Sequence, residues 1–468
     1  MKSSFFYKTQ WLSIAVLIGL VSAAGFAQTS TRPLLQDITV YTDKTPQAPA
    51  KADPSLVKKT SSAVPAPVSA AAIKTAIPVL ADVEIPGYSG VLVESVDGKV
   101  VVETGSNLPF NPASNVKVAT SYAVLKTFGP EYRFATNVWT DGSYEQATQT
   151  LHGNLYVSGR DPMFGYEHAV TLANELNKIG IRSIQGDLIV TDNFAMNFNT
   201  SATVASKTLI ATFDSAKRSG SATRVWENYL INSGKLNPNH AIPSVTFTGD
   251  AYVQSMPSNA KLLFTHESAP MREILKVMMC YSNNFIAERL GDAAGGPYSV
   301  ARISQQNLGI PSGEIYLQTS SGLGANRVTP TAMMKVLRGL RNELARYKMT
   351  FADIMPVAGR DRGTLENRFD TDFSSGSVIG KTGTLGNTDG GVSSLAGEIN
   401  TRGGKLLFVI FNQRGNVSRF RSFQNNYVSL IQGQFGGAAP ITYNAVSLDA
   451  RIAKTRVVYP PKSGMRSE

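Results

Sequence analysis

The chain contains very little cysteine and histidine for its length. It has one cysteine and four histidines among 468 residues. A single cysteine, Cys280, excludes an intramolecular disulfide, so the folded protein must be stabilised by its core. The histidines are scattered, and no cysteine or histidine pair has the spacing of metal ligands; they are His152, His168, His240 and His266. The sequence therefore predicts neither a metal nor a cofactor, and it argues against a histidine-based mechanism.

Long apolar runs are also scarce, and the longest lies at the N-terminus. Residues 1–27 carry Lys2 and Lys8, then an apolar run from Trp11 to Val21, then small residues. This order is typical of a secretory signal peptide. The run is shorter than the ~20 residues that a bilayer span needs, which favours cleavage over an uncleaved anchor. We therefore expect an exported protein in the periplasm or cell-wall space, with no transmembrane segment after cleavage.

Acidic residues are fewer than basic ones, with 34 Asp and Glu against 45 Lys and Arg. The resulting net charge of +11 favours anionic partners. No compact Lys/Arg tract is interleaved with aromatic residues, and the expected export conflicts with a nucleic-acid-binding role. Anionic cell-wall polymers are the expected partners instead.

Composition divides the chain into segments. Residues 28–80 are rich in Ala, Pro, Ser, Thr and Lys, which predicts a flexible tether. Residues 132–262 contain short strand-like runs, which predicts a β-rich lobe inserted into a catalytic domain made of residues 81–131 and 263–437. Residues 438–468 are basic and lack an amphipathic stripe, and we expect a basic C-terminal tail.

Periodicity within the larger domain predicts both helices and strands. Alternation over Val91–Val102, interrupted by an Asp-Gly turn, predicts a β-hairpin. Helical spacing covers Met271–Met279, and three further antiparallel strands are expected at Val378–Thr384, Val392–Ile399 and Lys405–Asn412. The expected fold class is α+β, with helices packed on an antiparallel sheet.

A serine and a lysine provide the first candidate for chemistry. A serine hydroxyl needs a nearby base to become a nucleophile, and with so few histidines that base would be a lysine. Ser114 and Lys117 lie three residues apart at the start of a predicted helix, hence on one face. The same spacing follows Ser55 and Ser258, so this pair alone could also be a solvated helix face.

Two further motifs strengthen the hypothesis. Ser282-Asn283-Asn284 is the only Ser-x-Asn in the chain and follows a predicted helix. Lys-Thr-Gly occurs once, at residues 381–383, on a predicted strand. This trio, in this order, is the signature of penicillin-binding proteins and active-site serine β-lactamases.

With these motifs the chain resembles the low-molecular-mass penicillin-binding proteins that act as D-alanyl-D-alanine carboxypeptidases and endopeptidases, in the branch with a lobe inserted after the serine helix. The resemblance runs from about Gly90 to Gln434 and includes the segments Asn284–Glu288, Asn326–Pro330 and Gly391–Gly397. It implies a serine β-lactamase/transpeptidase-like domain. It also implies a penicillin-sensitive serine DD-peptidase that acts on peptidoglycan stem peptides through an acyl-enzyme.

Two departures from that branch stand out. Thr319-Ser320 precede the Ser-Gly-Leu segment, where the branch usually has Asp-Gly, and residues 387–390 lengthen the loop after the Lys-Thr-Gly strand. These differences affect the expected substrate preference rather than the reaction type.

The resemblance implies roles for the motif residues. Lys117 would accept the proton of Ser114, and the backbone N–H groups of Ser114 and Thr384 would form the oxyanion hole. Ser282 and Asn284 would relay the proton to the leaving amine and hold the peptide.

The third motif would bind substrate. Lys381, with Thr382 or Thr384, would bind the terminal carboxylate, and Gly383 would allow the ligand close to the strand backbone. The catalytic set is therefore Ser114, Lys117, Ser282, Asn284 and Lys381, and β-lactams are the expected covalent inhibitors.

Two alternatives remain open at this point. A serine β-lactamase shares the three motifs and differs mainly in rapid deacylation, so slow loss of bound penicillin would favour the peptidase. A wall-binding protein with a relict site would not react with penicillin. The sequence does not rank carboxypeptidase against endopeptidase activity, and it leaves the oligomeric state open.

Overall fold

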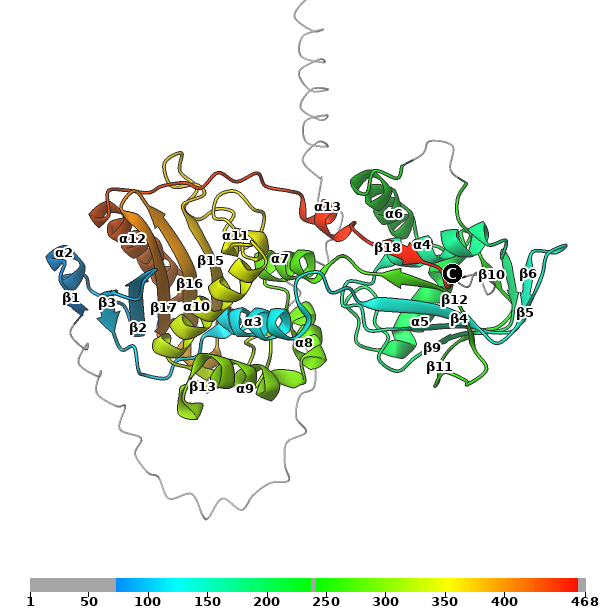
Figure 1. Ribbon diagram of the computed structural model, residues 1–468, viewed down its shortest axis with the longest axis horizontal. Coiled ribbons are helices and arrows are strands. Elements are labelled where there is room, and N and C mark those ends of the chain that lie inside the picture. Colours follow the sequence, from blue (N-terminus) through cyan, green and yellow to red (C-terminus); the bar gives the residue numbers. More distant parts are fainter. Residues whose placement is uncertain (1–72, 237–240, 462–468) are drawn as a thin grey trace, which may run out of the picture.

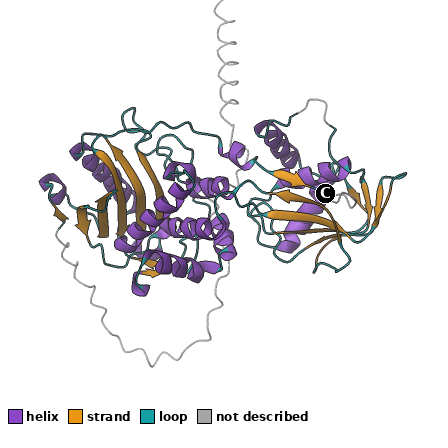
Figure 2. Ribbon diagram, in the orientation of Figure 1, coloured by secondary structure: helices purple, strands orange, loops and turns teal. Residues whose placement is uncertain are grey.

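The structure is a computed structural model that describes residues 73–236 and 241–461. The predicted signal peptide at 1–27 and the tether up to residue 72 lie outside these residues. Figure 1 shows the chain arranged as a larger and a smaller lobe side by side. Figure 2 shows that each lobe combines helices and strands.

A six-stranded sheet, antiparallel at every pairing, forms the centre of the larger lobe. In spatial order its strands are β1 (Lys74–Thr75), β3 (Val100–Thr104), β2 (Tyr88–Ser95), β17 (Gly404–Gln413), β16 (Val392–Thr401) and β15 (Val378–Leu385). The expected hairpin and the three expected strands are confirmed as parts of this sheet.

Both faces of this sheet are buried. Along β17, Leu407 and Phe411 pack into the core on one face, while Phe408 and Ile410 pack into the core on the other. Successive side chains of a strand point to opposite faces, so burial on both sides explains the continuous apolar run of this strand. The sheet is therefore the middle layer of the lobe.

Helices cover the two faces unequally. Most of them lie on the face that carries Phe411, and they are α3 (Val116–Phe128), α7 (Met271–Tyr281), α8 (Asn284–Ala293), α9 (Gly296–Leu308), α10 (Pro330–Arg346) and α11 (Phe351–Ile354). The other face is covered by α2 (Pro78–Ala81) and α12 (Val417–Gln434). Cys280 lies within α7 and is fully buried, which raises the pKa of its thiol to about 12.

Among its described residues, the smaller lobe contains two mixed sheets and three helices. One sheet has the order β11 (Ala251–Val253), β9 (Leu188–Val190), β7 (Leu155–Gly159), β4 (Ala135–Thr140), β12 (Lys261–Glu267) and β18 (Arg456–Val458). The other has the order β10 (Thr246–Phe247), β8 (Ser183–Gln185), β6 (Thr150–His152) and β5 (Ser143–Glu145). The helices are α4 (Tyr166–Lys178), α5 (Ala202–Phe213) and α6 (Gly220–Asn232).

The structure corrects the expectations for the chain ends. Strand β1 and most of helix α2 lie within the expected tether 28–80, so folded structure begins earlier than predicted. The expected tail 438–468 contains α13 (Leu448–Ile452) and β18, which pairs with β12 of the smaller lobe. These elements have two to five residues and take their stability from partners far away in the sequence, so no local pattern marks them.

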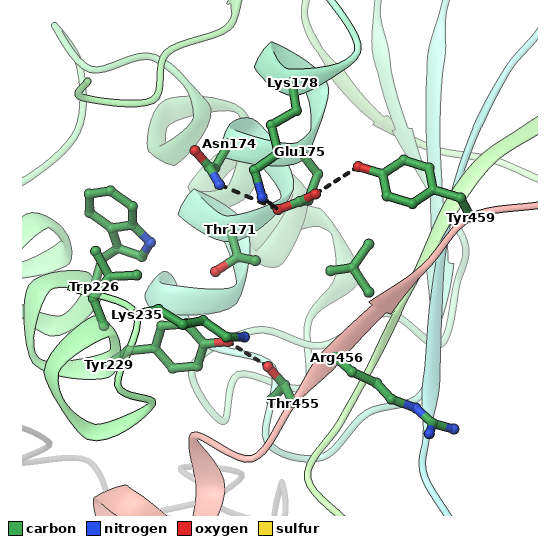
Figure 3. Close-up of a pocket in the computed structure, with 12 residues that line it drawn as sticks. Thr171, Asn174, Glu175, Lys178, Trp226, Tyr229, Lys235, Thr455, Arg456 and Tyr459 are labelled. Atoms are coloured by element: carbon green, nitrogen blue, oxygen red, sulfur yellow. Dashed lines mark hydrogen bonds and ion pairs between the residues drawn. The ribbon is translucent and has the colours of Figure 1, made fainter. Parts of the chain in front are cut away.

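The C-terminal segment closes one side of the smaller lobe. Tyr459 donates from its hydroxyl to Glu175 of α4 at 2.7 Å, and Thr455 is hydrogen-bonded to Tyr229 of α6 at 2.6 Å (Figure 3). The lobe predicted as β-rich at 132–262 also contains helices, and the C-terminal segment that includes Thr455 and Tyr459 packs against it. None of the helices in the described part of the chain combines the length and hydropathy of a membrane span.

Candidate active site

Ser114 lies in a single 3₁₀ turn, Ala113–Asn115, that leads directly into α3. Lys117 lies one turn further along, and its Nζ donates to the Ser114 hydroxyl at 3.0 Å. The Lys117 side chain is fully buried, with 0 % exposure. The spacing in the sequence therefore produces the contact that it predicts.

The turn carrying Ser114 is fixed against the sheet. Ser394 of β16 donates from its hydroxyl to the carbonyl of Pro112 at 2.7 Å, and the Asn115 amide donates to the Ser394 hydroxyl. Strand β15 approaches the turn so closely that a Cβ on Gly383 would lie 2.9 Å from the Ser114 nitrogen. Glycine is required at that position because no side chain fits there.

Lys117 is held by two further acceptors. Its Nζ donates to the side-chain oxygen of Asn284 at 2.8 Å and to the carbonyl of Ser321 at 2.7 Å. The segment with Ser321 is in turn held by Glu288, whose carboxylate accepts from the backbone nitrogens of Ser320 and Ser321 at 3.1 and 3.0 Å. These contacts bring together α3, α8 and the loop before β14 (Arg327–Val328).

A second lysine meets a second serine in the same place. Lys381 of β15 is fully buried, and its Nζ donates to the Ser282 hydroxyl at 2.8 Å and to the Thr382 carbonyl at 2.7 Å. Ser282 ends α7 in the left-handed conformation with φ 56°, and Asn283 caps α8 by accepting from Ile286. The sharp turn between these two helices brings both ends of the Ser-x-Asn motif to the site.

A cleft of about 670 Å³ opens over these groups, within the usual size of a small-ligand site. Six of the predicted residues line it, namely Ser114, Ser282, Asn284, Thr382, Gly383 and Thr384. Lys117 and Lys381 lie beneath the cleft and donate hydrogen bonds to Ser114 and Ser282, which line it. Sequence reasoning missed other lining residues, among them Leu323, Asn367, Arg368, Arg421 and Asn425. Of these five, only Leu323 carried a signal, through its place in the Ser-Gly-Leu segment.

The lengthened loop after β15 contributes to the same region. Asp389 forms an ion pair with Arg327 at 2.8 Å and accepts from the Asn111 amide at 2.8 Å. It adopts φ 51°, which Asp tolerates better than most residues. The loop therefore connects the segment before Ser114 with the segment after Leu323. Within residues 73–236 and 241–461, no three His, Cys, Asp or Glu side chains form a cluster suited to a metal ion.

A protein-family model matches most of this chain. The model of the D-Ala-D-Ala carboxypeptidase 3 (S13) family matches residues 74–202 and 212–430. The chain belongs to this family. It is thus a low-molecular-mass penicillin-binding protein and a serine-type D-alanyl-D-alanine peptidase, as the resemblance implied.

Two relatives have similar sequence identities to this chain. Carboxypeptidase DacB of Mycolicibacterium smegmatis is 26 % identical over 410 residues, covering 79 % of this chain and 86 % of that protein. A D-alanyl-D-alanine carboxypeptidase of an Actinomadura species is 25 % identical over 421 residues, covering 69 % and 77 % respectively.

Solved structures agree on the fold. The Bd3459 predatory peptidoglycan endopeptidase of Bdellovibrio bacteriovorus superposes with a TM-score of 0.65 at 21 % identity, covering 80 % of this chain and 100 % of that chain. Penicillin binding protein 4 of Haemophilus influenzae gives a TM-score of 0.56 at 22 % identity, covering 75 % and 97 %. The expected α+β transpeptidase-like fold is confirmed.

Proposed function

We propose that the protein cleaves D-alanyl peptide bonds of peptidoglycan stem peptides through an acyl-enzyme formed on Ser114. The observation that carries this proposal is the 3.0 Å contact between the fully buried Lys117 amine and the Ser114 hydroxyl. A base within hydrogen-bond reach is what a serine nucleophile requires.

Acylation would require Lys117 as the neutral amine, which takes the proton of Ser114 as the serine oxygen attacks the carbonyl of the penultimate D-alanine. The backbone N–H groups of Ser114 and Thr384 would stabilise the oxyanion, a contribution on the order of 3 kcal/mol per donor in comparable sites. The close approach of Gly383 to the Ser114 nitrogen supports this pairing, since it puts the two backbone segments side by side.

Ser282 would relay that proton from Lys117 to the leaving amine, which leaves Lys117 neutral again for deacylation, while Lys381 keeps its positive charge and holds the Ser282 hydroxyl through its hydrogen bond. Asn284 would hold the peptide backbone of the acyl part. The hydroxyls of Thr382 and Thr384 would bind the carboxylate of the leaving residue, with Lys381 adding positive charge from below. Water would then hydrolyse the acyl-enzyme and release the shortened peptide.

Penicillin should acylate Ser114, since β-lactams resemble the D-alanyl-D-alanine end. One solved structure of Bd3459 is the penicillin G acylated form, which supports the same expectation for this chain. The relatives are named both as carboxypeptidases and as endopeptidases, and the two activities would use the same acylation step. An exported location in the periplasm or cell-wall space fits a peptidoglycan substrate.

Intact-mass spectrometry after incubation with penicillin tests this assignment. The wild type should gain a single, slowly lost adduct, and Ser114→Ala should gain none. Ser258→Ala is the matched control, because Ser258 starts an exposed Ser-x-x-Lys sequence and should not affect labelling. No adduct on the wild type would favour a relict site, rapid drug turnover would favour a β-lactamase, and an adduct on Ser114→Ala would refute the assignment of the nucleophile.

A further inference from the structure

Two arginines line the cleft beside the predicted carboxylate-binding strand, and no sequence motif contains them. Arg421 comes from α12, and Arg368 comes from the segment between α11 and β15. Among the described residues, the hydrogen-bond partners of both guanidinium groups are neutral oxygens. Neither of these two cations is therefore neutralised by a carboxylate among the described residues.

Arg421 reaches the end of the Lys-Thr-Gly strand. Its Nη2 donates to the Thr384 hydroxyl at 2.9 Å. Helix α12 is fixed one turn later by Gln424, whose amide donates to Ser393 of β16 and Asn412 of β17 at 3.1 and 3.0 Å. The guanidinium is thus held beside a hydroxyl that, in the proposed function, binds the carboxylate of the leaving residue.

Arg368 provides a second positive charge behind Arg421. Its guanidinium donates to the side-chain oxygens of Asn425 and Gln424 at 2.8 and 3.1 Å. Burial, with a further contribution from the Arg421 charge, lowers the pKa of Arg368 to about 10, so it still carries its proton at neutral pH. Two neighbouring cations in a partly buried cleft are stabilised by an anion between or beside them.

Lys381 does not fill this role by direct contact. It is fully buried, and its Nζ already donates to Ser282 and to the Thr382 carbonyl. A guanidinium at the open side of the cleft has free donors in a planar fork, which matches the geometry of a carboxylate.

We propose that Arg421, supported by Arg368, binds the α-carboxylate of the leaving D-amino acid and makes the enzyme select substrates in which that carboxylate is free. The inference rests on the proposed function and adds a specificity-determining residue to it. A leaving residue whose carboxylate is amidated would lose the charge-assisted contact while keeping the same scissile bond.

The test compares two synthetic peptides that end in D-alanyl-D-alanine, one as the free acid and one as the carboxamide. Arg421→Gln should lower kcat/KM for the free acid by about 10- to 100-fold, as expected for loss of a charge-assisted hydrogen bond. The value for the carboxamide should change by less than about twofold. The preference of the wild type for the free acid would then shrink by about the same factor, because Thr382, Thr384 and Lys381 would still favour a carboxylate.

Arg419→Gln is the matched control. Arg419 lies on the same helix, and it faces Glu84 at 3.4 Å outside the cleft. It should leave both kcat/KM values unchanged. If Arg421→Gln lowered kcat/KM equally for both peptides, or did not lower it for the free acid, this inference would be overturned while the proposed function would stand. A wild-type protein that cleaves neither peptide and gains no penicillin adduct would overturn the proposed function, and the inference with it.

Discussion

Glu288 offers a way to disturb the proposed base without touching it. Its carboxylate accepts from the backbone nitrogens of Ser320 and Ser321, and the Ser321 carbonyl accepts from Lys117 at 2.7 Å. In Glu288→Gln one acceptor oxygen becomes an NH₂ group that faces a backbone N–H, so one of the two charge-assisted bonds is lost. Such bonds contribute about 1.5–3 kcal/mol each.

Because Glu288 is only half-buried, we expect a loss near the lower value, about 1.5 kcal/mol of unfolding free energy. The Ser321 carbonyl would move away from Lys117, and acylation should slow by about tenfold, the rate equivalent of a similar free energy. The assay measures the rate of labelling by a fluorescent penicillin beside thermal unfolding of the same preparation.

Asp292→Asn is the control for this experiment, since it makes the same chemical change one turn further along α8. It should leave labelling at the wild-type rate. A Glu288→Gln protein that is less stable yet labels at the wild-type rate would refute the reasoning, because Glu288 would then support the fold without positioning Lys117.

Two further predictions concern buried charge and protonation. The Asp361 carboxylate is 2 % exposed and lies 2.6 Å from the Lys276 amine. Lys276→Met leaves this buried carboxylate without its cation and should lower the free energy of unfolding, measured by urea denaturation, by about 3–5 kcal/mol. An unchanged free energy of unfolding would contradict this prediction. Burial lowers the pKa of His266 to about 3, whereas its pKa in the unfolded chain is about 6.5. The free energy of unfolding should therefore fall by about 1.4 kcal/mol per pH unit as the pH drops from 6.5 toward 3, because only the unfolded chain takes up the proton in this range. His266→Gln should flatten that part of the stability curve, and parallel curves for the two proteins would contradict the assignment.

The parts of the fold that the sequence predicted are those with strong local patterns. Strand β17 carries the apolar run Leu406–Phe411, since the sheet is buried on both faces, and α7 has a clear helical period. The three site motifs could be found because each combines rare residue types at a short spacing. Ser114 and Lys117 lie one turn apart, so their contact follows from local geometry alone.

The parts that the sequence did not predict depend on contacts between distant segments. Strand β18 has three residues and exists because β12 offers its edge. Arg421 shows no motif, and only the packing of α12 on the sheet brings its guanidinium to Thr384. Glu288 lay in a segment matched to the family, but its two backbone partners belong to a loop more than thirty residues away.

The inserted lobe raises the question of how the two halves of the site stay aligned. Lys117 and Asn284 lie 167 residues apart in the sequence, yet their side chains are 2.8 Å apart. The chain leaves the larger lobe and returns to it at one neck, where the nitrogens of Met271 and Arg272 donate to the carbonyls of Tyr132 and Pro130 at 2.8 and 3.0 Å.

The neck is reinforced by the C-terminal segment. Arg451 and Lys454 form ion pairs with Glu273 in the first turn of α7, at 2.8 and 2.6 Å. Because α7 ends at Ser282, these contacts fix the helix that delivers the Ser-x-Asn motif to the cleft. The hydrogen bonds and ion pairs at the neck thus add to the active-site contacts that align Ser114 with Ser282. A lobe of different size could be attached there without moving the two Ser–Lys pairs, provided that the same neck contacts were kept.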